Sequence, residues 1–171
     1  MSALADGGVQ YDMDTVCLGI DPGLARVGYG AVAQSGFKLK ALNYGCIETS
    51  PDMSFTERLL KIYEEMQTQI KICKPDLFSI ERLFFGKNTT TAEYVYQARG
   101  VVMLLAAQSN LPVVEPKPNQ IKLALCGTGD AVKSQVQGMV QRFLALDEVP
   151  KPDDTADALA AAITGLALKI S

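Results

Sequence analysis

The chain has 171 residues, 48% of them hydrophobic, which predicts one domain with a sizeable buried core. It contains no histidine, which excludes Ser-His and Cys-His catalysis and histidine zinc sites. The formal net charge is −3, yet residues 82–142 carry seven basic and three acidic residues, a local excess that favours contact with phosphate.

Residues 1–14 lack the basic start and apolar middle of a signal peptide. We expect them to be a disordered extension of a single domain over residues 15–171. The four cysteines are far apart without a Cys-x-x-Cys spacing, which predicts reduced thiols in a cytoplasmic protein. No apolar stretch reaches the length of a membrane span, so no membrane contact is expected.

Three strands are predicted at the start of the domain, over Val16–Asp21, Val27–Gln34 and about Phe37–Glu48, and their short connections indicate an antiparallel meander. The first strand ends in Asp21, and Pro22-Gly23 follows as a turn. An unpaired buried charge is unfavourable, so this carboxylate needs a cation, a hydrogen-bond cage or water. We interpret Asp21 as the floor of a metal site.

A helix and a further strand are predicted next. Ser54 and Glu57 have the spacing of a capping box, and apolar residues then recur at helical intervals. The following run, Asp76–Glu81, is a short strand that also ends in a carboxylate. A strand–helix–strand crossover makes this strand parallel to the first, so Asp21 and Glu81 should emerge at one edge, where open α/β sheets bind ligands.

The middle of the chain combines a polar loop with an apolar helix. The loop, Arg82–Asn88, contains Phe84 and Phe85, which are either core residues or aromatics that stack on or wedge between bases. The helix predicted over Thr89–Ser109 is apolar nearly all round, which indicates burial in the centre or against a second chain. Leu111–Glu115 is predicted as the last strand.

A short helix over Asn119–Leu125 and another helix over Ala131–Leu146 are predicted after the sheet. They carry Lys122 and Lys133, which are either ordinary surface lysines or phosphate contacts.

The last predicted helix, Asp153–Lys169, places Asp154 and Asp157 one turn apart on one face, with Asp153 as its N-cap. Its other face is mostly alanine and leucine, which lets a helix lie close to a sheet. Taken singly, Asp154 or Asp157 is explained by the helix dipole, and Glu81 by a salt bridge. Taken together with Asp21, they offer the oxygen ligands that Mg²⁺ prefers, and two such ions can catalyse phosphoryl displacement.

The order and spacing of several motifs are specific: GIDPG (Gly19–Gly23), GYG (Gly28–Gly30), the segment Ile80–Asn88, QARG (Gln97–Gly100), KSQV (Lys133–Val136) and DDTADALAAAIT (Asp153–Thr164). From about residue 16 to residue 168 the chain resembles the RuvC-type Holliday junction resolvases. The resemblance implies an RNase H-like α/β fold, a five-stranded mixed sheet flanked by helices. In it the first three strands are antiparallel and the later strands run parallel to the first.

The resemblance also implies a function. The chain would be a metal-dependent endonuclease that cuts two opposed strands of a four-way DNA junction, in DNA recombination and repair. It would do so as a cytoplasmic homodimer, after a branch-migration complex of RuvA and RuvB type. The cofactor would be Mg²⁺, two ions per site, with Mn²⁺ as a substitute. The implied catalytic and metal-binding residues are Asp21, Glu81, Asp154 and Asp157, and the implied DNA-binding residues are Phe84, Lys87, Lys122 and Lys133.

Two alternatives remain open from the residues alone. A non-catalytic junction-binding protein would share the basic segment but would not need four converging acids. An ATP-using domain of the actin and sugar-kinase group also opens with an Asp-x-Gly turn, although this chain is short for the second domain that such enzymes need.

Overall fold

The computed structural model describes residues 15–83 and 89–169. The elements follow in the order β1 (Thr15–Asp21), β2 (Arg26–Ser35), β3 (Lys38–Glu48), α1 (Phe55–Cys73), β4 (Leu77–Ile80), α2 (Thr89–Gln108), β5 (Val113–Val114), α3 (Pro118–Cys126), α4 (Lys133–Phe143) and α5 (Asp153–Lys169). Within these ranges no helix combines the length and the apolar character needed to cross a membrane. The predicted disordered extension, residues 1–14, lies outside the described residues.

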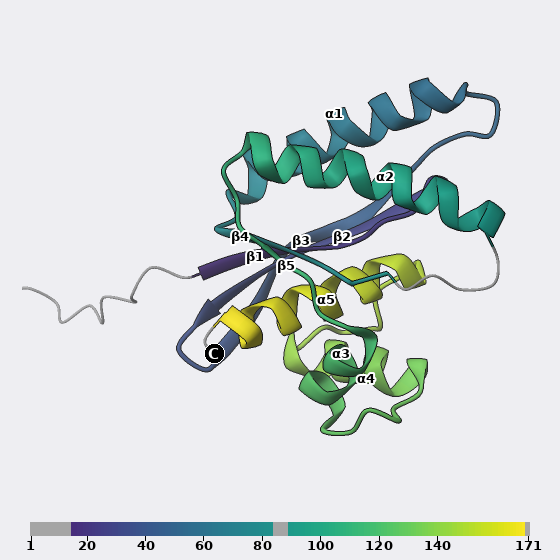
Figure 1. Ribbon diagram of the computed structural model, residues 1–171. Coiled ribbons are helices and arrows are strands. Elements are labelled where there is room, and N and C mark those ends of the chain that lie inside the picture. The colour runs from purple at the N-terminus through teal and green to yellow at the C-terminus, as the bar shows by residue number, and fades with distance from the viewer. Residues whose placement is uncertain (1–14, 84–88, 170–171) are drawn as a thin grey trace, which may run out of the picture.

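The five strands form one mixed sheet in the order β3-β2-β1-β4-β5. The first three strands pair antiparallel, β4 lies parallel to β1, and β5 lies parallel to β4. The predicted fold class is therefore confirmed. Helices α1 and α2 cover one face of the sheet and α5 covers the other, with α3 and α4 beyond α5 (Figure 1).

Two hydrophobic cores lie on the two faces of the sheet, because successive side chains of a strand point to opposite sides. On β1, Leu18 and Ile20 pack in the core that contains the buried residues of α1 and α2. Cys17, the residue before Leu18, points to the other face and packs in the core that contains residues of α3, α4 and α5. The central strands β1 and β4 are thus buried on both faces.

The element boundaries follow local hydrogen bonds. The predicted capping box begins α1: the Ser54 hydroxyl accepts the N–H of Glu57, and the Glu57 carboxylate accepts the N–H of Ser54 at 2.7 Å. Helix α4 is shorter than predicted and begins at Lys133, because the Gln135 side chain accepts the Val132 N–H at 2.8 Å and fixes the start there. Strand β5 is shorter than the predicted strand Leu111–Glu115 and contains only the two residues that pair with β4.

Candidate active site

Asp21 and Glu81 are brought together by the pairing of two parallel strands. Strands β1 and β4 pair in register up to Ile20 and Ile80, so the two carboxylates occupy the next position on each strand. Cys17 packs on the α5 side of the sheet, and because side chains alternate along a strand, Asp21 points to that same side. Leu77, which pairs with Cys17, packs in the same core, so Glu81 points to this side as well. Both acids therefore meet the N-terminal end of α5.

Two glycines allow α5 to lie against the sheet at this edge. Gly28 on β2 is the residue paired with Asp21, and a Cβ atom there would collide with the carbonyl oxygen of Asp154. A Cβ atom at Gly19 on β1 would collide with the carbonyl oxygen of Ala158. The close approach predicted from the alanine-rich face of α5 is confirmed, and it sets the first turns of α5 beside the end of β1.

The charges on the four acids act on one another. Burial raises the pKa of Asp21 to about 7, and the negative charges of Asp157, Asp154 and Glu81 add to this effect. The pKa of Glu81 is raised by burial and by Asp157, and Lys122 opposes the shift. A site in which ionised carboxylates disfavour one another this strongly favours a bound cation. Asp21 therefore lies within electrostatic range of the other three carboxylates that the sequence predicts for the site.

Lys133 supplies positive charge on the α4 side of this site. Its ammonium lies 3.0 Å from the Asp157 carboxylate and 3.3 Å from that of Asp153. Burial raises the pKa of Asp157, while the hydrogen bond from Lys133 counteracts this rise. The interpretation of Asp153 as an N-cap is wrong: the helix begins at Asp153 itself, and its exposed carboxylate pairs with the lysine instead.

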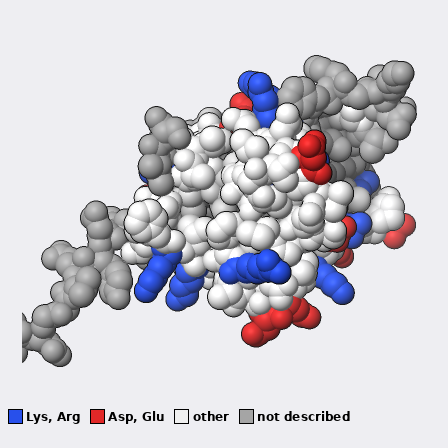
Figure 2. Space-filling view, turned by 90° about the horizontal axis from the view of Figure 1, so that it is seen from below, with Lys and Arg blue, Asp and Glu red and all other residues white. Residues whose placement is uncertain are grey.

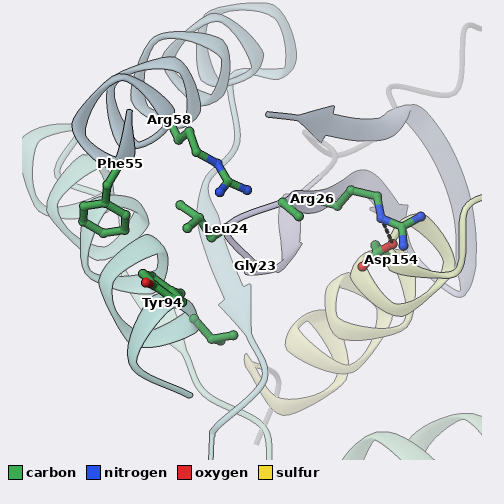
Figure 3. Close-up of a pocket in the computed structure, with 9 residues that line it drawn as sticks. Gly23, Leu24, Arg26, Phe55, Arg58, Tyr94 and Asp154 are labelled. Atoms are coloured by element: carbon green, nitrogen blue, oxygen red, sulfur yellow. Dashed lines mark ion pairs between the residues drawn. The ribbon is translucent and has the colours of Figure 1, made fainter. Parts of the chain in front are cut away.

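Arg26 supplies positive charge on the opposite side. Its Nε atom lies 3.6 Å from the Asp154 carboxylate, an ion pair drawn in Figure 3. Sequence reasoning gave Arg26 no role. The one feature that could have indicated a role for Arg26 is its position at the start of the strand that follows the Asp-Pro-Gly turn. Its partner, Asp154 on α5, is 128 residues further along the chain, so local spacing could not predict the pair.

The four acids fit a divalent metal by their chemistry. The donors are all carboxylate oxygens, which suit Mg²⁺ or Mn²⁺. Among the described residues no three His, Cys, Asp or Glu side chains are already grouped as a metal cage. Lys133 and Arg26 instead neutralise part of the charge of Asp157 and Asp154. The arrangement is thus an acidic site whose charge is partly balanced by two side-chain cations.

A cavity of about 450 Å³ joins the acids to the predicted phosphate contacts, because Glu81, Asp157, Lys122 and Lys133 all line it. The face that carries α3 and α4 is otherwise largely uncharged, with lysine and arginine side chains scattered singly or in small groups (Figure 2). Lys122 and Lys133 therefore remain predicted phosphate contacts as individual residues that line the cavity. The predicted DNA contacts Phe84 and Lys87 lie outside the described residues.

Comparison with known proteins agrees with this geometry. The family model described as crossover junction endodeoxyribonuclease RuvC matches residues 17–165. A crossover junction endodeoxyribonuclease RuvC of Desulfitobacterium hafniense is 52% identical over 146 residues, which are 85% of this chain and 88% of that protein. The corresponding protein of Brevibacillus brevis is 50% identical over 86% of this chain and 89% of its own length.

Solved structures give the same result. Thermus thermophilus RuvC in complex with a Holliday junction substrate superposes with a TM-score of 0.83 at 36% identity, covering 88% of this chain and 92% of that one. The yeast mitochondrial Holliday junction resolvase has a TM-score of 0.60 at 14% identity, covering 86% and 77%, a likeness of fold alone.

Proposed function

The chain belongs to the RuvC family of crossover junction endodeoxyribonucleases and resolves Holliday junctions, and we propose that it cuts them with Asp21, Glu81, Asp154 and Asp157. The observation that carries this proposal is that the pairing of β1 with β4 and the close packing of α5 set Asp21 and Glu81 beside the end of the helix that carries Asp154 and Asp157. The charges of Asp157, Asp154 and Glu81 add to the raised pKa of Asp21, which supports a shared site. A protein that only binds junctions has no need of such a site.

We propose that Mg²⁺ is the cofactor, with two ions per site and Mn²⁺ as a substitute. When bound, two such ions stabilise charge on the attacking and leaving oxygens of a phosphodiester. Asp21 would be shared between them, Glu81 and Asp157 would complete their ligands, and Asp154 would either bind metal or orient the attacking water. The products would be a 5′-phosphate and a 3′-hydroxyl.

Lys122 and Lys133 would hold the phosphate that is cut. Both line the cavity that also contains Glu81 and Asp157, so a phosphate in contact with the acids lies within their reach. Lys133 already pairs with Asp157, and a phosphate offers its ammonium an alternative partner. A compact ammonium on a flexible stem suits such an exchange.

We further propose that residues 15–171 act as one nuclease domain in a cytoplasmic homodimer, downstream of a RuvA/RuvB-type motor. Helix α2 is the proposed dimer interface. Leu104 on this helix is 53% exposed, so its apolar side chain is available to a second chain. A two-fold dimer would place two sites on a junction that shares its symmetry.

The test is cleavage of a synthetic four-way DNA junction with Mg²⁺, beside a linear duplex of the same arms. The Asp157→Asn variant, which removes one metal ligand without changing side-chain volume, is the matched control. We expect paired symmetric nicks in the junction alone, and loss of cutting in the variant.

Any other outcome of this experiment would contradict a particular part of the proposed function. Cutting of both substrates would show a nuclease without junction selectivity. Binding without cutting under any metal would show a non-catalytic junction binder. Full activity of the variant would remove Asp157 from the proposed metal site.

A further inference from the structure

A second cavity, of about 510 Å³, borders the catalytic acids through Asp154. Its walls come from the turn after β1, the first turn of α1, and α2, as Figure 3 shows. The volume lies in the range of small-ligand pockets, about 300–1,000 Å³. The proposed reaction so far leaves this cavity without a role, although it adjoins the site where the phosphodiester is cut.

Arg58 of α1 is held at this cavity by a chain of hydrogen bonds. Its Nε atom donates to the Thr49 hydroxyl at 2.8 Å, and that hydroxyl donates to the Leu24 carbonyl at 2.6 Å. The Thr49 N–H donates to the Ala25 carbonyl at 3.0 Å. Arg58 is therefore fixed to the turn that directly follows Asp21.

The guanidinium of Arg58 is left with binding capacity. Among the residues that the structure describes, Arg58 forms no ion pair, whereas Arg26 on the same cavity is paired with Asp154. Figure 3 shows Arg58 extending toward the turn at Gly23 while Arg26 points away toward Asp154. A planar guanidinium with free N–H groups suits a phosphate oxygen pair.

The remaining wall of the cavity is aromatic. Phe55 and Tyr94 join α1 to α2 there, with ring centroids 5.6 Å apart and ring planes tilted by 49°. An aromatic ring surface beside a cationic group matches the base and phosphate of a nucleotide. The cavity thus offers both kinds of contact next to the acids.

We propose that this cavity binds the nucleotide next to the cut, with Arg58 as the residue that holds its phosphate. The inference rests on the proposed function. A strand whose scissile phosphate lies between the acids and Lys133 continues past Asp154, and the cavity receives its neighbouring phosphate. Arg58 then fixes which phosphate of the strand enters the acidic site.

The first experiment measures junction binding by the full chain in Ca²⁺ over a series of salt concentrations. We expect Arg58→Gln to raise the Kd about ten-fold, the loss of one charge-assisted contact. The slope of log K against log salt should fall by about one. Lys61→Gln is the matched control: it removes one positive charge from the same helix, at a lysine that pairs with Glu65 and does not line the cavity.

The second experiment replaces single phosphates beside the cut by uncharged methylphosphonates. We expect one position that weakens binding by the wild type and has no further effect in Arg58→Gln, the non-additivity of two groups in contact. If thermal unfolding shows that Arg58→Gln does not fold, the methylphosphonate series measured with the wild type alone tests the proposed subsite. One sensitive position adjacent to the cut supports the subsite, and the absence of any such position overturns it.

Two further outcomes would overturn the inference without touching the proposed function. An unchanged salt slope in Arg58→Gln would show that the residue contacts no phosphate. A weaker dimer in sedimentation, with unchanged binding per dimer, would show that the cavity receives a partner chain. Failure of the wild type to cut junctions would instead contradict the proposed function.

Discussion

The Asp21 carboxyl group has the most strongly raised pKa of the acids at the site, about 7 against an ordinary value of 3.8. Burial is the main cause, followed by the charges of Asp157, Asp154 and Glu81. The fold therefore favours the protonated form. In the metal-free protein the contribution of Asp21 to stability is complete below about pH 4 and is lost as pH rises through 7.

This linkage predicts the effect of Asp21→Asn on the metal-free protein. At pH 8 the substitution removes an unfavourable buried charge, so the free energy of unfolding should increase by on the order of 2 kcal/mol. At pH 4 the change should be small, because the carboxyl group is already neutral. Urea unfolding in EDTA at both pH values measures the difference, with exposed Glu148→Gln as the control. An equal gain at both pH values would contradict the prediction.

Metal affinity should depend on the same proton. A divalent cation binds the ionised carboxylate, so affinity falls as pH drops below the pKa of Asp21. We expect Mn²⁺ to bind about ten-fold more weakly at pH 6 than at pH 8, one proton being displaced. Titration calorimetry of the DNA-free protein in two buffers of different ionisation enthalpy measures both the affinity and the proton release. A pH-independent affinity would exclude Asp21 as a ligand.

The residues of the site differ in how far sequence could predict them. Asp21 and Glu81 were predictable, because each ends an apolar strand and the crossover rule places both at one edge. The ion pairs of Arg26 and Asp153 were not. They depend on where α5 and α4 come to lie, and neither local spacing nor apolar pattern specifies such a contact.

At the scale of elements, the packing of α5 on β1 and β2 decides where two of the acids lie. The helix contacts the strands through glycines on the sheet and small residues on the helix. The alanine-rich face predicted this approach, and the capping box predicted the start of α1. The sequence pattern predicted α4 to begin two residues too early, because the hydrogen bond that the Val132 N–H donates to the Gln135 side chain fixes its start.

Gly28→Ala should therefore affect activity through position. The new Cβ atom would meet the backbone at Asp154, so α5 has to move. We expect a loss of stability of about 1–3 kcal/mol and a fall in junction cleavage at temperatures where the variant is still folded. Gly138→Ala on α4 is the control, since open space surrounds it and alanine favours helix by about 1 kcal/mol. Normal cleavage by folded Gly28→Ala would show that the position of α5 is not critical.

At the scale of the whole molecule, the homodimer that we propose would supply the two sites needed to cut two opposed strands at once. The single chain carries one set of acids, at one edge of one sheet. Helix α2 lies on the outer layer with α1, on the face of the sheet opposite α5 (Figure 1). Joining two chains through α2 would leave both acidic edges accessible, which supports the interface that we propose.

Leu104→Glu tests this arrangement, because a charge within an apolar interface is strongly unfavourable. Leu104 is 53% exposed in the single chain, so the fold itself should tolerate the change. We expect a monomer in sedimentation and a shift from paired to single nicks on a junction, since a lone chain cuts one strand at a time. Phe37→Glu introduces the same charge at a fully exposed aromatic in the turn between β2 and β3, and it should leave the dimer intact. A dimer that persists in Leu104→Glu would move the interface away from α2, and paired nicks by a proven monomer would make the two-fold arrangement unnecessary.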